Sequence, residues 1–537
     1  MSRRDEPAPA VGASAAGGPR GVRMFTALEA VAVLCLLVYL VTTAAYVGEP
    51  LLDQHAFRQC QTAISVPWLA ADLDPRRMLV YETPILGAPW RVPFEFPLYQ
   101  WLAAIVVRLT GWPVGQSCRI VAAVFHLACL WPLWRIVRTC GGTERLWTLL
   151  ASLFLLAPVL HHWSRAALIE TTAVFFSLEY LAAMVAWSRR PAPWRLAAAA
   201  AAAVPAVLVK VTTFPPFAVA AGIACLLAEW PRYRAAGRLV PAAVRLLPAV
   251  VPLAVALACL VPWLADADAV KRLNPIAAST TSAALGAWNY GTLIQKLSPQ
   301  LWVGTVLLRA IPEAIGWPGL LVLGAGLVAA DRRARLVAGG LTGLFLLPFV
   351  LFTNLHMVHN YYQVANAPWL VAALAVVVES LSKRLPQPAW IGLVLLCLGG
   401  QACESLRFYL PMEQIDFSRD ARLAVARRLK SELDRDDVAV FVGFDWSPEI
   451  AFYAERRAVY IPRMVSCDTL ASIAADPARV TAGRRIGAMV VWVNNDNMAV
   501  QSPEDETKNK LSFQWVARFA SGGRGEQIND YLMWFGR

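Results

Sequence analysis

Charged residues are scarce in this chain. They make up 16% of its 537 residues, against about a quarter in an average soluble domain. Hydrophobic residues account for 58%, and the mean hydropathy is +0.49. Apolar runs of about 20 residues, long enough to cross a bilayer, recur along the chain. This composition excludes an ordinary soluble enzyme and predicts an integral membrane protein.

Several common site motifs are also missing. The ten cysteines form no C-x-x-C pair and mostly lie inside apolar runs, so we expect neither a disulfide framework nor a cysteine-based metal site. The sequence has no G-x-G-x-x-G fingerprint, no P-loop and no internal repeat. Its net charge of +12 is not gathered into a basic patch on a soluble segment. No nucleic-acid partner is therefore expected.

Apolar runs predict about eleven membrane-spanning helices. They cover residues 24–46, 118–138, 145–162, 167–187, 194–211, 213–230, 245–264, 316–330, 335–353, 364–381 and 389–405. Residues 1–23 are rich in Ala, Gly, Pro and Arg, and we expect a disordered cytoplasmic N-terminus. The first run is too long for the core of a signal peptide, so it is kept as a helix.

Basic residues fix the expected orientation. With the N-terminus inside, the inner segments collect most of the loop Arg and Lys, among them Arg135, Arg138, Arg145, Arg189, Arg190, Arg332, Arg333, Lys383 and Arg384. Basic loop residues favour the cytoplasmic side. The first loop, 47–117, then lies outside, as do residues 265–315 and everything after 406. A spanning helix at 96–110 would invert every later loop, so this short, proline-flanked run is predicted to lie in the outer interface.

The tail, residues 407–537, reads as a soluble α/β domain. Helices are predicted at 419–433 and 448–454, and strands at 438–443, 459–461, 486–493 and 531–535. The size is ordinary for one domain. The predicted fold is therefore a polytopic α-helical membrane domain, residues 24–406, followed by this extracytoplasmic α/β domain.

Polar side chains cluster on the predicted outer face. The strongest cluster, Asp53 to Gln59, directly follows the first helix, and hydrocarbon does not tolerate such groups. Asp53 is a candidate general base, and an N-cap is the competing interpretation. Glu170 is either a second catalytic carboxylate or a first-turn acid favoured by the helix dipole. These interpretations are compatible.

Cations and aromatic residues on this face have two interpretations. Arg58, Arg165 and Lys210 are suited to bind a phosphate, or to anchor lipid headgroups. His359 and Tyr361 are suited to hydrogen-bond phosphate or sugar, or to form part of an interfacial aromatic belt. A His/Glu metal site has no diagnostic ligand spacing. No metal ligand is assigned, and a divalent cation stays an open alternative.

Three local strings resemble one family: D-x-H-x-x-R-Q at Asp53, Y-E-T-P-x-x-G at Tyr81 and P-F-E-F-P-L-Y-Q at Pro93. The later residues Glu170 and Lys210 and the H-x-Y-Y element at 359–362 belong to the same resemblance. The chain is similar to GT-C glycosyltransferases that use polyprenyl-phosphate-linked sugars. This group includes protein O-mannosyltransferases and the bacterial lipid A aminoarabinose transferase. The resemblance covers about residues 24–405. It implies a multi-pass enzyme of the bacterial inner membrane, acting in cell-envelope polysaccharide synthesis.

The resemblance implies roles residue by residue. Asp53 matches the catalytic acid of the first loop and Glu170 the second outer carboxylate, while Gln54 stands where many members have a second acid. The expected donor phosphate and lipid contacts are Arg58, Arg165, Lys210, His359 and Tyr361. The expected substrate contacts are His55, Gln59, Tyr81, Glu82 and Glu95.

The implied reaction transfers a sugar from a polyprenyl-phosphate donor to an extracytoplasmic glycan, lipid or protein, with inversion. Its partners are the lipid-linked donor, the acceptor and the bilayer. The alternative from another functional class is a transporter or flippase of lipid-linked sugars. That alternative predicts internal repeats and charges at the bilayer midplane. Neither is evident in the sequence.

Overall fold

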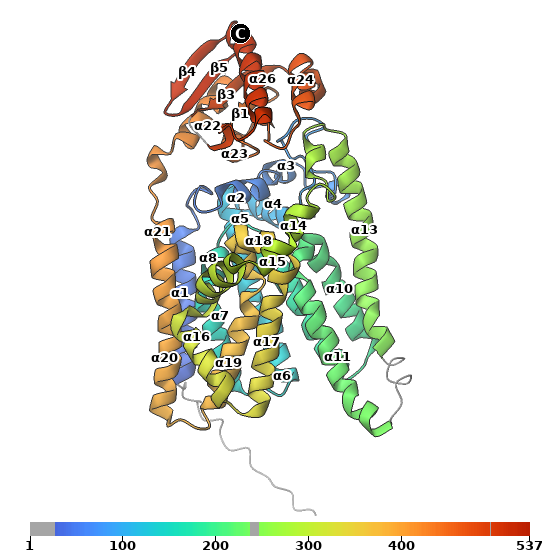
Figure 1. The fold of residues 1–537 in the computed structure, drawn as a ribbon, viewed down its shortest axis with the longest axis vertical. Helices are drawn as coiled ribbons and strands as arrows, with labels where there is room; N and C mark the ends of the chain where they lie inside the picture. Colours follow the sequence, from blue (N-terminus) through green and yellow to red (C-terminus); the bar gives the residue numbers. More distant parts are fainter. Residues whose placement is uncertain (1–26, 237–245, 494–495, 537) are drawn as a thin grey trace, which may run out of the picture.

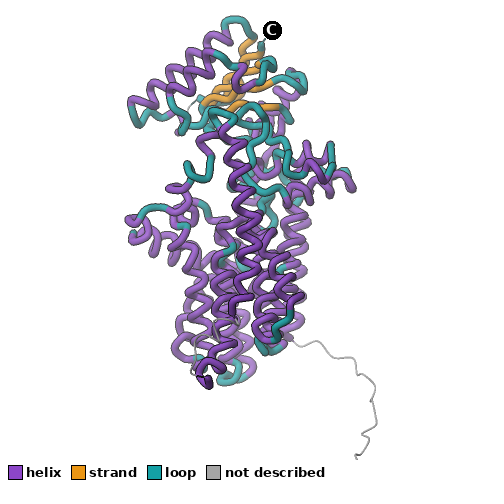
Figure 2. Tube along the Cα trace, turned by 90° about the vertical axis from the view of Figure 1, so that its right-hand side faces the viewer, coloured by secondary structure: helices purple, strands orange, loops and turns teal. Residues whose placement is uncertain are grey.

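The structure is a computed structural model that describes residues 27–236, 246–493 and 496–536. The N-terminal residues predicted to be disordered lie outside these ranges. A bundle of long helices forms one end of the molecule and a small sheet domain forms the other (Figures 1 and 2). The first loop and the C-terminal domain meet at the same end of the bundle.

The bundle is built from helices that follow the predicted apolar runs. Their bounds are α1 Ala27–Tyr46, α5 Val114–Ala128, α6 Leu130–Thr139, α7 Glu144–Leu156, α8 Pro158–Trp163, α9 Glu170–Arg189, α10 Pro193–Lys210, α11 Pro215–Ala236, α13 Val251–Arg272, α14 Gly286–Tyr290, α15 Leu293–Leu297, α16 Ile311–Ala329, α17 Arg332–Leu351, α18 Thr353–Val358, α19 Ala367–Leu381, α20 Gln387–Glu404 and α21 Leu410–Glu413. Each predicted run overlaps at least one of these helices, the runs 118–138 and 145–162 hold two each, and α14, α15 and α21 lie outside the predicted runs.

Eight helices in the described part of the chain are long and apolar enough to cross a membrane. They include α1, the joined α5–α6, and a helical segment from Gln300 to Ala329 that contains α16 and is kinked at Gly316. Two other predicted runs form the shorter apolar helices 215–231 and α19. The run at 145–162 is interrupted because Ala157 leaves the helical conformation before Pro158. The chain is thus a multi-pass membrane protein.

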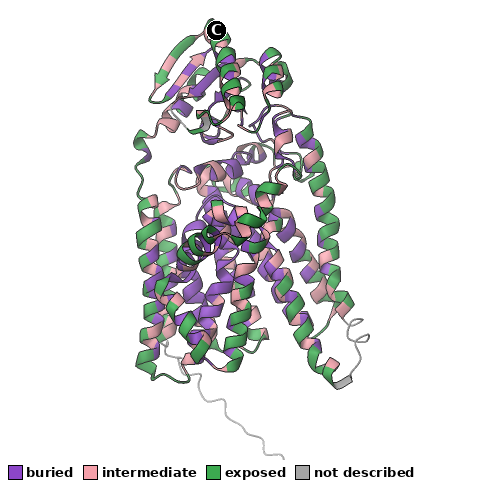
Figure 3. Cartoon of the chain, in the orientation of Figure 1, coloured by how far each residue is buried: buried purple, intermediate pink, exposed green. Residues whose placement is uncertain are grey.

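Exposed residues lie along the outer helices of the bundle (Figure 3), and many of them are large and apolar. Leu34 and Val41 on α1 and Val261 on α13 are exposed at 60%, 66% and 62%. A soluble monomer rarely exposes such a broad apolar surface. This surface suits contact with lipid.

Close helix packing inside the bundle depends on Gly316. Its φ is +68°, and a Cβ at this position would lie 2.7 Å from the carbonyl carbon of Gly400. A side chain would therefore collide with the backbone of α20. The glycine lets the 300–329 helix bend and approach α20 closely.

The first loop forms three helices between α1 and α5. These are α2 Ala56–Ala63, α3 Val66–Ala71 and α4 Leu98–Thr110. α4 packs against α3 and α5, and Leu109 near its end is 81% exposed. At 13 residues, α4 is too short to span a bilayer on its own. An interfacial placement of α4 stays a prediction.

The C-terminal part contains a five-stranded sheet in the order β2-β1-β3-β5-β4. Strands β1 Val438–Val442, β2 Arg457–Tyr460 and β3 Ile486–Trp492 are parallel, while β4 Arg524–Ile528 and β5 Tyr531–Phe535 add an antiparallel pair. The accompanying helices are α22 Ala421–Glu432, α23 Glu449–Ala454, α24 Cys467–Ala475, α25 Ala478–Thr481 and α26 Pro503–Ala520. The predicted strands are confirmed, whereas β4, α24 and α26 were not foreseen.

The sheet domain is hydrogen-bonded to the first loop. The Ala458 N–H donates to the Pro84 carbonyl at 2.9 Å, and the Ala88 N–H donates to the Val480 carbonyl at 2.7 Å. A single hydrophobic core runs from the first loop into the sheet. The domain therefore helps to fix the loop that carries Asp53.

Candidate functional site

Asp53 lies in the turn between α1 and α2, where two side chains hold its carboxylate. Arg119 on α5 donates to its Oδ2 at 3.0 Å, and the Gln59 amide donates to its Oδ1. The Gln59 carbonyl in turn accepts from the Ala167 N–H at 3.0 Å. Asp53 is therefore fixed against both the bundle and α2.

The side chain of Asp53 does not cap a helix. α2 starts after His55, whose backbone has φ 52°, and this helix has no side-chain cap hydrogen bond. The Asp53 side chain is 10% exposed and borders a small cleft with Glu49 and Arg119. Its carboxylate is thus held by side chains at a cleft wall.

Glu170 is the first residue of α9, as predicted, and forms a buried ion pair with Lys210. The two side chains are 1% and 7% exposed. The Lys210 ammonium also lies 3.9 Å from the ring centre of Tyr362 and 5.3 Å from that of Tyr361. The second Glu170 oxygen, Oε2, is buried and has no hydrogen-bond partner. A fixed cation and an unsatisfied acceptor therefore lie together beneath the H-x-Y-Y element.

His55 joins the first loop to that element. Its ring lies 5.2 Å from the His359 ring, 5.0 Å from Tyr361 and 5.4 Å from Trp163, centre to centre. Burial lowers the pKa of His55, and burial together with the nearby charges of His55 and Arg58 lowers the pKa of His359 to about 3. Both imidazoles are consequently neutral near pH 7.

Arg58 faces the same region from α2. It forms an ion pair with Glu95 and donates to the Gln61 carbonyl at 2.7 Å. Glu95 is buried and accepts from the Gln100 amide at 2.6 Å, and its backbone carbonyl accepts from the Tyr81 hydroxyl at 2.6 Å. Tyr81 and Glu95 therefore support Arg58 from behind.

Of two further residues singled out from the sequence, Glu82 points away from the site, whereas Arg165 lines the same small cleft as Asp53. Glu82 pairs with Arg457 of the sheet domain at 3.0 Å, so it connects the two parts of the molecule. Arg165 pairs with Glu413 at 2.6 Å and lies over the Tyr46 ring. Whether either residue binds substrate stays a prediction.

Sequence reasoning missed three members of this region. Arg119 was overlooked although a charge inside an apolar run is a strong functional signal. Glu413 was assigned to the soluble tail, whereas helical structure continues from α20 through α21 and brings it to Arg165 and His162. Arg309 is the third missed residue. Arg309 donates to the backbone carbonyls of residues 356 and 357 and, within the described residues, forms no ion pair.

Metal ligands do not gather here. Within residues 27–236, 246–493 and 496–536, no group of three or more His, Cys, Asp and Glu side chains is placed to hold an ion. Arginine and lysine occupy the positions beside the carboxylates instead. The role of a divalent cation, left open by the sequence, has no test in this geometry.

The helical bundle, the first-loop helices and the C-terminal sheet domain together define a GT-C fold, as the resemblance implied. One solved structure that the chain is similar to is ArnT from Cupriavidus metallidurans bound to undecaprenyl phosphate. The TM-score is 0.59 at 16% identity, over 95% of this chain and 98% of that chain. The apo state of ArnT gives a TM-score of 0.56 at 15% identity with the same coverage.

A structure of the mycobacterial arabinofuranosyltransferase AftD also aligns, with a TM-score of 0.49 at 15% identity over 95% of this chain and 41% of that chain. No protein-family model matches the sequence. No curated protein matches it either. At 16% and 15% identity, the similarity to the two ArnT structures establishes the fold alone.

Proposed function

We propose that the chain is a membrane glycosyltransferase that moves a sugar from a polyprenyl-phosphate-linked donor to an acceptor hydroxyl outside the cytoplasm. The observation that carries the proposal is the gathering of Asp53, Glu170, Lys210 and Arg58 at one end of a GT-C bundle. The ArnT structure with bound undecaprenyl phosphate supports this donor class.

Asp53 is the proposed general base. A carboxylate can accept a proton from an acceptor hydroxyl, and the Asp53 carboxylate lies at the wall of a small cleft. The acceptor oxygen gives its proton to Asp53 and bonds to the sugar C1. The bond between C1 and the phosphate oxygen breaks, and the configuration at C1 inverts. Gln59 and Arg119 keep the carboxylate in place for this step.

The leaving polyprenyl phosphate carries away the electron pair and needs positive charge more than a proton. Lys210 and Arg58 are the proposed charges, and Arg309 joins them because no carboxylate of the described chain lies within ion-pair distance of it. The neutral imidazoles of His55 and His359 and the Tyr361 hydroxyl add uncharged hydrogen-bonding groups. Arg165, Gln59, Tyr81, Glu82 and Glu95 complete the proposed substrate and donor contacts.

The proposed location is the bacterial inner membrane, with the N-terminus in the cytoplasm. Basic loops at 138–145, 189–195, 332–335 and 383–384 support this orientation. The first loop and the sheet domain lie at the opposite end of the bundle (Figure 1). We assign residues 24–406 to the transmembrane domain and 407–537 to the extracytoplasmic domain.

The test is donor turnover by the purified full-length chain in nanodiscs. A panel of radiolabelled polyprenyl-phosphate sugars is offered with candidate glycan acceptors, and free polyprenyl phosphate is measured. We expect one donor to be consumed by the wild-type chain and spared by the Lys210→Met variant. In parallel, the same donors are followed across the bilayer of reconstituted vesicles. Transbilayer movement without any sugar release would replace the transferase by the transporter.

A further inference from the structure

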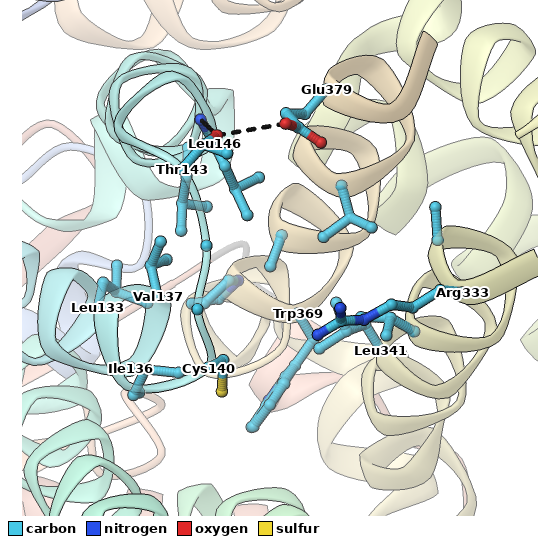
Figure 4. Close-up of a pocket in the computed structure, with 18 of the residues that line it drawn as sticks. Leu133, Ile136, Val137, Cys140, Thr143, Leu146, Arg333, Leu341, Trp369 and Glu379 are labelled. Carbon is cyan, nitrogen blue, oxygen red and sulfur yellow. Dashed lines mark hydrogen bonds between the residues drawn. The ribbon is translucent and has the colours of Figure 1, made fainter. Parts of the chain in front are cut away.

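A cavity of about 380 Å³ lies at the end of the bundle away from the first loop. Its lining comes from α6, α7, α9, α11, α17 and α19, together with the loops that begin at Cys140 and Asp331 and with Lys383 after α19 (Figure 4). None of the proposed catalytic or donor-binding residues lines it. The cavity is therefore separate from the candidate site.

The cavity is elongated along α19. Its lining residues on this helix run from Pro368 to Glu379, which is about 17 Å at the rise of an α-helix. Its walls are mainly apolar and include Leu133, Leu178, Phe217, Leu341 and Trp369. This is the shape and polarity of a slot for a hydrocarbon chain.

The slot opens toward the outside of the bundle along α17. Val337 lines the cavity and is also 44% exposed on a helix long and apolar enough to cross a membrane. Its neighbour Leu336 is 69% exposed. Acyl chains of the surrounding bilayer can therefore enter from the side without crossing a polar barrier.

The mouth of the slot carries an unpaired cation. The Arg333 guanidinium points into the cavity toward Trp369 (Figure 4) and forms no ion pair among the residues that the structure describes. The acids beside it are already engaged: Asp331 accepts from Ser380 at 2.8 Å and lies 3.9 Å from Lys383, and Glu379 accepts from Thr143 at 3.2 Å. A free guanidinium over an apolar slot is suited to an anionic headgroup with its tail inside.

We propose that this slot binds an acidic phospholipid of the bilayer, with one acyl chain between α6, α9 and α19 and the headgroup phosphate on Arg333. Basic pockets between membrane helices bind such headgroups in this way. The lipid stabilises the α17–α19 side of the bundle, because its tail fills space that no side chain of the described lining occupies. This site is distinct from any polyprenyl-phosphate site on the opposite face.

Native mass spectrometry of the full-length chain, released from detergent with phosphatidylglycerol or phosphatidylcholine, tests the proposal. We expect preferential retention of phosphatidylglycerol, weakened about tenfold or more by Arg333→Gln, since a hydrogen bond between charged groups is lost. Arg332→Gln is the matched control, because Arg332 is also exposed but does not line the slot. Ala372→Phe, which fills the slot, should remove retention.

Thermal unfolding without added lipid shows that each variant is folded, and a second measurement does not depend on the variants. Cys140 lines the slot, so phosphatidylglycerol should slow its alkylation by a maleimide while leaving the exposed Cys403 unaffected. Equal retention of both lipids, equal effects of the two arginine substitutions, or unprotected Cys140 would overturn the proposal. So would Arg333-dependent retention of polyprenyl phosphate in place of phosphatidylglycerol.

Discussion

The substitution Asp53→Asn separates a proton-accepting role from an anchoring role. Asparagine has the same shape, and its oxygen can still accept the hydrogen bond from Arg119, although its NH2 group then loses the hydrogen bond from Gln59; it cannot take up the acceptor's proton. General-base catalysis contributes about 10²–10⁴-fold to a rate. We therefore expect kcat to fall at least about a hundredfold, with unchanged affinity for the lipid-linked donor.

The structural cost of this substitution can be worked from the same contacts. Arg119 is 5% exposed and keeps a backbone hydrogen bond to the Pro50 carbonyl at 3.1 Å when the Asp53 charge is removed. Hydrogen bonds to charged groups contribute about 1.5–3 kcal/mol, so unfolding should become easier by about that amount. Arg119→Gln is the matched control, because it breaks the same ion pair but retains the carboxylate. Its stability loss should be similar, and its activity loss much smaller.

The assay combines single-turnover transfer, donor binding and thermal unfolding for the wild-type chain and both variants. A base predicts a large gap in kcat between Asp53→Asn and Arg119→Gln at similar melting temperatures. An anchor predicts equal losses in both variants. If Asp53→Asn keeps more than a tenth of the wild-type kcat, a loss smaller than a general base supplies, then Asp53 has no part in the proton transfer.

Three further predictions follow from the pairs around the site. Glu170→Gln and Lys210→Met should each lower the free energy of unfolding by about 3–5 kcal/mol, because each leaves a buried charge alone. In thermal unfolding, the double variant should lose less stability than the sum of the two single losses. Simple additivity would show that the two side chains are not coupled. Burial lowers the pKa of His359 from 6.5 to about 3. Between these pH values the folded state therefore binds fewer protons than the unfolded state, and the free energy of unfolding should fall as the pH drops below 6.5. His359→Phe should flatten that melting-temperature profile, and an unchanged slope would contradict this account. Arg457→Lys should cost about 1–3 kcal/mol and speed proteolytic release of the sheet domain, because Arg457 pairs with Glu82, whereas the more exposed Arg484→Lys should change little.

Hydrophobic periodicity and length were sufficient to predict the long apolar helices of the bundle, because a span of this kind is recognised without knowing what packs against it. The parallel strands of the tail were also predictable, since a buried run such as 438–442 is short and rich in β-branched residues. The exposed strand β4, with the sequence RGEQI, carries no such signal and is stabilised by pairing with β5. The continuation of α20 into α21 was missed because Arg407 and Pro411 look like the end of a span.

The sequence predicted on which side of the membrane the site residues lie, but not which of them form pairs. The sequence placed Asp53, Glu170 and Lys210 on one side of the membrane, and the structure brings Glu170 to Lys210 across 40 positions. The partner of Asp53 is Arg119, which lies 66 positions away on α5, and the partner of Arg165 is Glu413, which lies 248 positions away. Pairing over such separations is set by helix packing, which one sequence does not encode in any local pattern.

The pairing pattern itself bears on how a phosphate would be held. Burying an isolated cation costs several kcal/mol, so Arg58, Lys210 and Arg165 can lie this deep only because Glu95, Glu170 and Glu413 balance them. A donor phosphate adds negative charge to a region that is already balanced pair by pair. Phosphate binding is favoured beside a cation that has N–H donors outside any ion pair, as Arg309 has among the described residues. It is also favoured where a carboxylate can rotate away, as Glu170 can, because its Oε2 forms no hydrogen bond that would be lost. We therefore propose that a donor phosphate would lie between α9 and the H-x-Y-Y element. Asp53, held by Arg119, would then stay free of the phosphate to receive a proton.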